Sequence, residues 1–197
     1  MAATGPGRPS LLVQRRGEIV DAFIRLVALK GLEGVTLDDI AADAQLQRSS
    51  VRHFVGNRRE LVAAAIVELT GRYAHGFREG LSGASGIDDL ITLAFSRSWL
   101  AKTGDDAVAF AALIEEATRS PDLVGELRGA YDAILTEVQA PIRRDYPDAT
   151  SAQIRETAYA ILCLIEHNTF MQRLGYPIAL SRGVARAARE MVRGLSA

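Results

Sequence analysis

The sequence predicts an all-α protein. Apolar residues recur at helical spacing in nearly every segment, whereas the regular alternation of apolar and polar residues that marks a half-buried strand is absent. Turn-forming residues separate the helical segments, for example Thr103-Gly104, Ser120-Pro121 and Gly175-Tyr176-Pro177. With 197 residues, of which 48% are hydrophobic, the chain is long enough for one small module and one larger helical body.

Charge is distributed unevenly along the chain. We predict a flexible N-terminal arm over residues 1–10, a helix-turn-helix domain over 11–60 and a helical domain over 61–197. Residues 1–60 hold nine basic and seven acidic side chains, a net charge of +2, so the remainder carries −3. A basic end on an otherwise acidic protein predicts a localised anionic partner rather than general binding to polyanions.

The cysteine content and the apolar runs indicate a cytoplasmic location. Cys163 is the lone cysteine, which excludes an intramolecular disulfide and a cysteine-only metal cluster. The N-terminus has no apolar signal core. The longest apolar run, residues 158–165, is far shorter than the roughly 20 residues needed to span a bilayer, so we expect no membrane association.

The first two helices have clear boundaries. Ile19, Phe23 and Val27 lie on one face of a helix expected over 12–30, and Gly31 follows where a helix would end in a left-handed residue. Thr36 can then cap a second, short helix through its hydroxyl, and the acidic residue three positions later completes a capping box.

The third helix, expected over residues 47–55, carries the polar chemistry. With 100° per residue and Val51 pointing inward, the following Phe54 and Val55 point inward as well. The outward face then consists of hydroxyl groups, an imidazole and a guanidinium, contributed by Ser49, Ser50, Arg52 and His53. Such a face can read the edges of bases.

Six further helices are expected. Asn57 can cap a fourth helix that runs through Leu61 to about Phe77, and a glycine- and serine-rich break follows over residues 80–86. The remaining helices are predicted over 87–102, 106–119, 121–144, 151–174 and 179–195.

Residues 31–37 (GLEGVTL), Ile40-Ala41 and residues 44–61 resemble the N-terminal domain of TetR-family transcriptional regulators. The resemblance is specific over about residues 12–66. It implies that the third helix enters the major groove, that Arg58 holds a phosphate, and that a homodimer with a ligand pocket in its C-terminal body reads a pseudo-palindrome.

Three positions depart from the family pattern. The family commonly has Gly, Ser and Tyr where this chain has Gln45, Gln47 and Arg52. The first two substitutions make the turn between the helices less ideal. The third replaces a phosphate-binding phenol with a cation, and whether Arg52 anchors a phosphate or reads a guanine stays open.

The predicted DNA-binding residues cluster in an acid-free stretch, residues 44–59, and at the helix N-termini on either side of it. An ordinary solvated surface is the alternative for the basic ones. The predicted set is Thr36, Arg48, Ser49, Ser50, Arg52, His53, Asn57 and Arg58.

Aromatic and polar residues of the C-terminal body are candidates for a ligand cavity. Glu166, His167 and Asn168 interrupt an apolar helix, and polar groups in such a segment need partners, which a ligand can supply. An apolar or amphipathic ligand would suit these walls, and Glu166 could favour a cation; ordinary core packing is the alternative for each residue. The predicted ligand-binding set is Phe95, Trp99, Phe110, Tyr131, Tyr159, Cys163, Glu166, His167 and Phe170.

The last predicted helix is strongly amphipathic, and we expect its apolar side to contribute to a dimer interface. Packing within the same subunit is the alternative. That side consists of Leu180, Val184, Ala187, Ala188, Met191, Val192 and Leu195.

Taken with the resemblance, these patterns predict a sequence-specific DNA-binding transcriptional regulator, a ligand-responsive repressor that acts as a homodimer on a pseudo-palindromic operator. The expected partners are double-stranded DNA, an unidentified small-molecule effector and a second copy of the chain, with no cofactor and no metal. The alternatives are an activator of the same family, or a helical small-molecule-binding protein or enzyme without operator binding. An enzyme has little support, because no H-E-x-x-H, Walker-type or G-x-S-x-G motif occurs.

Overall fold

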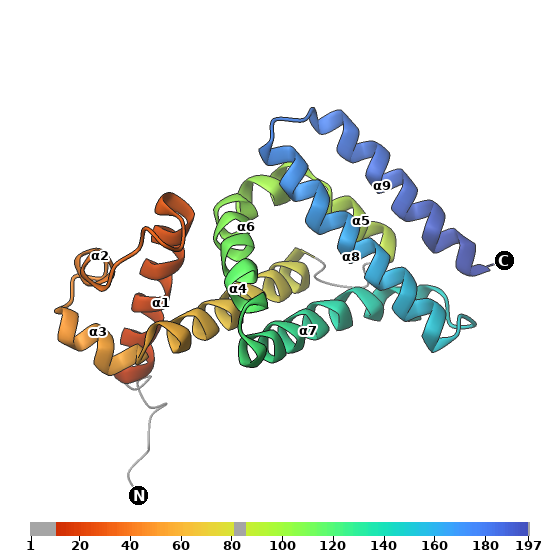
Figure 1. The fold of residues 1–197 in the computed structure, drawn as a ribbon. Coiled ribbons are helices and arrows are strands. Elements are labelled where there is room, and N and C mark those ends of the chain that lie inside the picture. The colour runs from red at the N-terminus through yellow and green to blue at the C-terminus, as the bar shows by residue number, and fades with distance from the viewer. Residues whose placement is uncertain (1–10, 81–85, 197) are drawn as a thin grey trace, which may run out of the picture. The chain divides into compact units, whose positions relative to one another are not determined.

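The computed structural model describes residues 11–80 and 86–196, and every regular element in that part of the chain is helical (Figure 1). The all-α class is therefore confirmed, while the predicted arm over residues 1–10 lies outside the described residues. The elements are α1 (Leu11–Lys30), α2 (Leu37–Asp43), α3 (Arg48–Val55), α4 (Arg58–Gly80), α5 (Ile87–Ala94), α6 (Arg97–Thr118), α7 (Pro121–Asp145), α8 (Ser151–Arg173), α9 (Ile178–Arg193) and the 3₁₀ turn η1 (Gly194–Ser196).

The chain forms two compact units. The described residues up to Leu69, together with Val108–Leu127, make the first unit, and Thr70–Ala107 with the described residues from Arg128 onward make the second. The chain passes between the units within α4, α6 and α7. No helix among residues 11–80 and 86–196 combines the length and the apolar character needed to cross a membrane.

Within the first unit, α1, α2 and α3 pack against one another in all three pairs. Ile19, Phe23 and Val51 are fully buried in the resulting core. Ion pairs of 2.5 Å between Arg25 and Asp43 and of 2.6 Å between Lys30 and Asp39 join α1 to α2.

The end of α1 agrees with the sequence-based expectation. Gly31 has a φ of +72° and donates its N–H to the carbonyl of Val27 at 2.9 Å. Glycine is therefore favoured where the helix stops, because left-handed backbone is costly for other residues.

One predicted helix boundary is wrong. Helices were expected over 87–102 and 106–119, separated at Thr103-Gly104, but the break lies at Phe95-Ser96 and α6 continues through residue 104. Ser96 Oγ accepts the N–H of Trp99 at 3.1 Å, which caps the start of α6. Thr103 donates its hydroxyl to the carbonyl of Trp99 at 2.9 Å, so its polar group is satisfied inside the helix.

The core of the second unit is aromatic where α4 meets α6. The rings of Phe77 and Trp99 stack with their centroids 4.5 Å apart, and Tyr73 lies 6.5 Å from the same indole. Helix α9 packs on α5 and α8. The buried Ser181 of α9 donates to Asn168 Oδ1 of α8 at 2.9 Å, which is a polar contact inside that interface.

Candidate nucleic-acid interface and ligand groove

A reciprocal capping box starts α2. Thr36 Oγ1 accepts the N–H of Asp39 at 3.1 Å, and the Asp39 carboxylate accepts both the N–H and the hydroxyl of Thr36 at 3.0 and 2.7 Å. Hydrogen bonds first from Lys30 and then from Thr36 hold the pKa of Asp39 well below its usual range. The first turn of α2 is thus fixed by local chemistry that the sequence already indicated.

The turn that joins α2 to α3 contains a left-handed residue. Gln45 has a φ of +54°, and among the described residues no other non-glycine has a positive φ. The N–H of Leu46 donates to the carbonyl of Ala41 at 2.8 Å and closes the turn. Gln47 then precedes α3 without a side-chain cap. The departures at Gln45 and Gln47 therefore lie in a turn that has neither a glycine at its left-handed position nor a side-chain cap on the next helix.

Helix α3 presents the face that its sequence predicts. Val51 and Val55 are buried, Phe54 and Ser50 are half-buried, and the remaining predicted contact residues Arg48, Ser49, Arg52 and His53 are exposed.

The two arginines of this face differ in their surroundings. Arg48 pairs with Asp38 of α2 at 3.1 Å. Within the described residues, the Arg52 side chain has no hydrogen-bond or ion-pair partner. The ring of His53 packs edge-on against that of Phe54, with the centroids 5.2 Å apart. In α3, the guanidinium of Arg48 is therefore paired with a carboxylate of the chain, and that of Arg52 is not.

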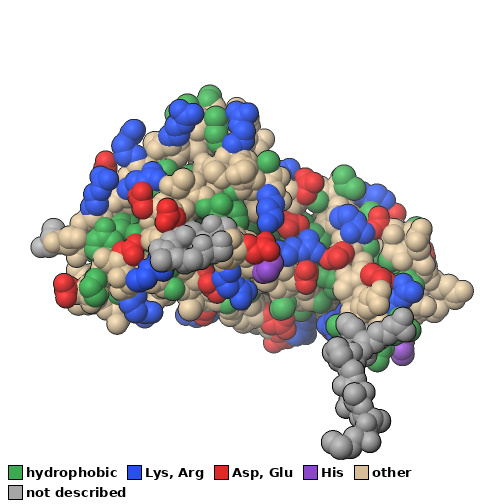
Figure 2. Space-filling model, turned by 180° about the vertical axis from the view of Figure 1, so that it is seen from behind, with side chains coloured by type: hydrophobic (Ala, Val, Ile, Leu, Met, Phe, Trp, Pro, Cys, Tyr) green, Lys and Arg blue, Asp and Glu red, His purple; other side chains and the backbone are tan. Residues whose placement is uncertain are grey.

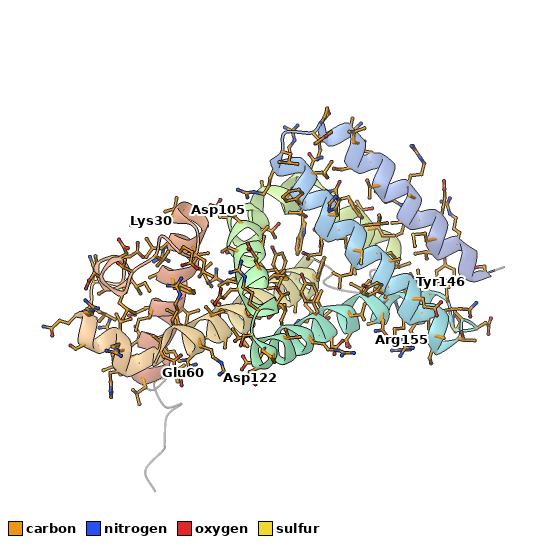
Figure 3. The ribbon with its side chains drawn as sticks, viewed as in Figure 1. Lys30, Glu60, Asp105, Asp122, Tyr146 and Arg155 are labelled. Atoms are coloured by element: carbon orange, nitrogen blue, oxygen red, sulfur yellow. The ribbon has the colours of Figure 1, made fainter. Side chains whose placement is uncertain are left out.

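The start of α4 is held on both sides. Asn57 Oδ1 accepts the N–H of Glu60 at 3.0 Å, and the Glu60 carboxylate accepts the N–H of Asn57 at 2.7 Å, so the predicted cap is present. Figure 3 labels Glu60 at this point. The guanidinium of Arg58 donates to the carbonyls of Leu32 at 2.6 Å and Val35 at 3.2 Å, which joins α4 to the loop between α1 and α2. Sequence reasoning missed this contact, because its partners lie 23 and 26 residues away.

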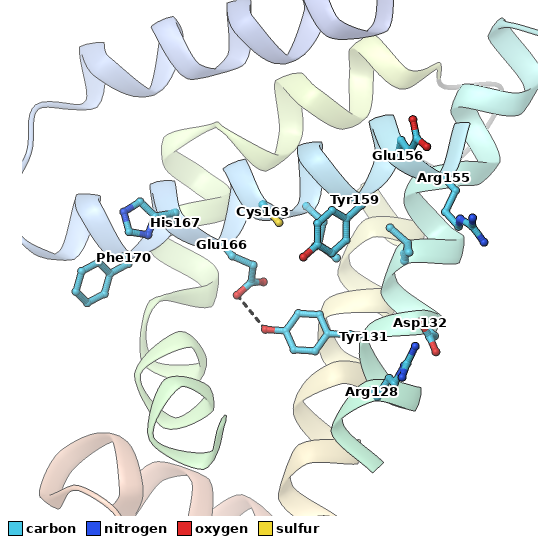
Figure 4. Close-up of a pocket in the computed structure, with 12 residues that line it drawn as sticks. Arg128, Tyr131, Asp132, Arg155, Glu156, Tyr159, Cys163, Glu166, His167 and Phe170 are labelled. Atoms are coloured by element: carbon cyan, nitrogen blue, oxygen red, sulfur yellow. Dashed lines mark hydrogen bonds between the residues drawn. The ribbon is translucent and has the colours of Figure 1, made fainter. Parts of the chain in front are cut away.

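A groove of about 880 Å³ lies between α7 and α8 in the second unit (Figure 4). It brings together six of the nine predicted ligand-binding residues: Tyr131, Tyr159, Cys163, Glu166, His167 and Phe170. The other three, Phe95, Trp99 and Phe110, do not line it and are buried. The remaining lining residues were missed, although most lie one helical turn from Tyr131 or Tyr159: Arg128, Asp132, Leu135, Arg155, Glu156 and Leu162.

Glu166 and Tyr131 meet inside this groove. The Tyr131 hydroxyl donates to Glu166 Oε2 at 3.4 Å (Figure 4). Burial raises the pKa of Glu166, and the hydrogen bond from Tyr131 offsets part of that rise. Burial, followed by the Glu166 charge, raises the pKa of both Tyr131 and Tyr73 above the ordinary tyrosine value. Among the carboxyl groups that line the groove, that of Glu166 therefore has phenol groups as its neighbours.

Helix α9 divides its predicted apolar side between two faces. Ala188 and Val192 are buried, along with Ser181 and Ala185. Leu180 and Met191 are 55% and 39% exposed. Ala187 is also exposed, and Val184 and Leu195 are half-buried. Packing within the subunit thus accounts for one face of α9 only, and a second apolar face stays uncovered. Figure 2 shows apolar and basic side chains next to one another over α9.

The comparisons with known proteins agree with this architecture. No protein-family model matches the chain. The HTH-type transcriptional regulator BetI from Agrobacterium fabrum is 26% identical over 152 residues, which cover 75% of this chain and 73% of that protein. The HTH-type nicotine-responsive transcriptional repressor HdnoR from Paenarthrobacter nicotinovorans is 26% identical over 94 residues, 48% of each chain.

Among solved structures, a TetR transcription regulator from Haloarcula marismortui superposes with a TM-score of 0.73 at 16% identity, over 92% of this chain and 98% of that one. The chain therefore has the fold of TetR-family regulators, as its sequence predicted. The relatives it matches are described as transcriptional regulators and not as enzymes.

Proposed function

We propose that this chain is a TetR-type, sequence-specific DNA-binding regulator that acts as a homodimer, represses transcription in the cytoplasm and responds to a small molecule. The observation that carries the proposal is the exposed face of α3, where a guanidinium without an internal partner stands beside an imidazole and two serines. A helix of this width fits the major groove, and these groups match the donors and acceptors on base edges.

The proposed DNA contacts fall into two kinds. Ser49, Ser50 and His53 on α3 face the bases, and Arg52 beside them contacts either a base or a phosphate. Phosphates lie against the cation of Arg48 and against the N-termini of α2 and α4, where Thr36, Asn57 and Arg58 are placed. Two of the five N–H donors of Arg58 are used by backbone carbonyls, so the others stay available to a phosphate.

A homodimer is supported by the uncovered apolar face of α9 and η1, defined by Leu180, Val184, Ala187, Met191 and Leu195. A second copy that brings the same face against it would bury these side chains around a two-fold axis. Two-fold symmetry also places two α3 helices at half-sites about one helical turn of DNA apart, about 34 Å. Repression and a response to a ligand are supported by the description of HdnoR as a nicotine-responsive repressor.

An effector changes DNA affinity only if it favours one separation of the two α3 helices of the dimer over another. The groove between α7 and α8 is the proposed effector site, because it gathers aromatic, apolar and ionisable groups in one concave surface.

Selection of bound sequences from a random DNA pool tests the function directly. The expected result is a pseudo-palindromic site bound by the wild type. If Arg52 reads a guanine, Arg52→Ala weakens the best site by about 1–3 kcal/mol and relaxes preference at one base pair. If it holds a phosphate, all sequences weaken alike and the slope of log K against log salt falls by about 0.9.

The matched control is Arg143→Ala, which removes the same charge from an exposed position of α7 in the second unit. It should leave the selected sequence unchanged. Absence of any sequence preference in the wild type at low ionic strength would contradict the proposal.

A further inference from the structure

The α8 side of the groove combines aromatic rings with a single enclosed carboxyl group. Tyr159 and Phe170 lie on the same face of α8 as Glu166, and Tyr131 approaches from α7 (Figure 4). Tyr159 and Phe170 are 63% and 51% exposed, so their ring faces are open to a ligand. The faces of such rings attract cations.

The charges around the groove are not evenly balanced. Arg128 and Asp132 on α7 and Arg155 and Glu156 at the start of α8 bring two cations and two anions to one part of it. Glu166 lies further along α8, and no cation is among the groups that perturb it. A carboxylate enclosed in this way is costly without a positive partner, because the phenol of Tyr131 supplies one long hydrogen bond and no charge.

We propose that the effector is an organic cation with an apolar or aromatic body, whose charge lies beside Glu166 and whose body lies against Tyr131, Tyr159 and Phe170. The inference rests on the proposed function for the location of the effector site and adds the chemistry of its ligand. On binding, the fraction of Glu166 that carries a proton releases it to solvent, so that the cation replaces the proton as the partner of the carboxylate.

Two ions of matched size and shape provide the probe: tetraphenylphosphonium, a cation, and tetraphenylborate, an anion. Both present four phenyl rings, so a groove that selects only for apolar bulk binds them equally. Calorimetric titration of the wild type should give an affinity for the cation at least about tenfold above that for the anion, a difference of 1.4 kcal/mol.

Glu166→Gln tests the carboxylate, because the amide keeps the shape and can still accept from Tyr131. The preference for the cation should fall to less than about threefold, which is within the range of ring contacts alone. Glu190→Gln is the control, since it removes the same charge from an exposed position of α9 and should retain the wild-type preference. Tyr131→Phe keeps the ring, removes the hydrogen bond and should retain cation binding.

Proton release provides a second, independent measurement. Titration in buffers of different ionisation enthalpy should show release of a fraction of a proton per cation bound, and cation affinity should rise with pH because Glu166 has a raised pKa. The other titratable groups around Glu166 and its phenol neighbours are Tyr131 on α7, Cys163, His167 and Arg173 on α8, Tyr73 on α4 and Asp106 on α6. Glu166→Gln should abolish the proton release, whereas His167→Gln should retain it.

Equal affinity for the two ions, or an unchanged preference in Glu166→Gln, overturns the inference. Binding to the selected DNA site is measured on the same preparations. DNA binding without cation selectivity defeats only the ligand assignment, whereas cation selectivity without any DNA preference defeats only the proposed function.

Discussion

Arg58 provides the sharpest test of how the first unit is held together. Its guanidinium donates to the carbonyls of Leu32 and Val35 at 2.6 and 3.2 Å. Hydrogen bonds to charged groups contribute about 1.5–3 kcal/mol each. Arg58 is exposed and water can replace the guanidinium at either carbonyl, so we reduce this value to about 1 kcal/mol per bond. The two bonds together then predict that Arg58→Met lowers the free energy of unfolding by about 2 kcal/mol.

The assay is thermal and urea denaturation followed by far-UV circular dichroism. A loss of about 2 kcal/mol corresponds to a fall in Tm of about 4–8 °C for a chain of this length. Arg58→Lys keeps the charge but not the two-pronged donor geometry, so it should be destabilised nearly as much while keeping the salt dependence of DNA binding. Arg52→Met, which removes an arginine without an internal partner, is the matched control. Stability of Arg58→Met within about 0.5 kcal/mol of that control would refute the reasoning.

Three further predictions concern single positions. Gln45→Gly should stabilise the protein by about 0.5–1 kcal/mol in urea denaturation, because relief of a left-handed residue exceeds the entropic cost of glycine; a loss of stability would contradict this. Gly56→Ala should destabilise it, since a Cβ would lie 1.7 Å from the capping carboxylate of Glu60 at a φ of +73°, and an unchanged Tm would be the contrary result. Met191→Glu should shift sedimentation from dimer to monomer, while Leu29→Glu on α1 should not; a persistent dimer would exclude this face.

The first three helices could be predicted because their signals are local. Gly31 ends α1 and the Thr36 capping box starts α2, and both depend on residues within four positions of each other. The boundary between α5 and α6 could not be predicted in this way. Thr103 and Gly104 are typical of a turn, and only the hydrogen bond from Thr103 to Trp99 shows that a helix accommodates them.

The groove between α7 and α8 was predicted in part for a related reason. Tyr159, Glu166 and Phe170 share one helix face, so their proximity follows from spacing alone. Trp99 has the same residue type and a comparable periodic position, but it stacks on Phe77 of another helix. Tertiary packing decides whether an aromatic residue lines a groove or fills the core, and a single helix does not encode that choice.

The ion pair between Arg48 and Asp38 bears on the proposed contact between Arg48 and a phosphate. Asp38 pairs with Arg48 at 3.1 Å, so in the proposed complex a phosphate would replace one anion with another instead of neutralising an unpaired cation. The proposed Arg48 contact would therefore add less to non-specific attraction to DNA than an unpaired arginine would.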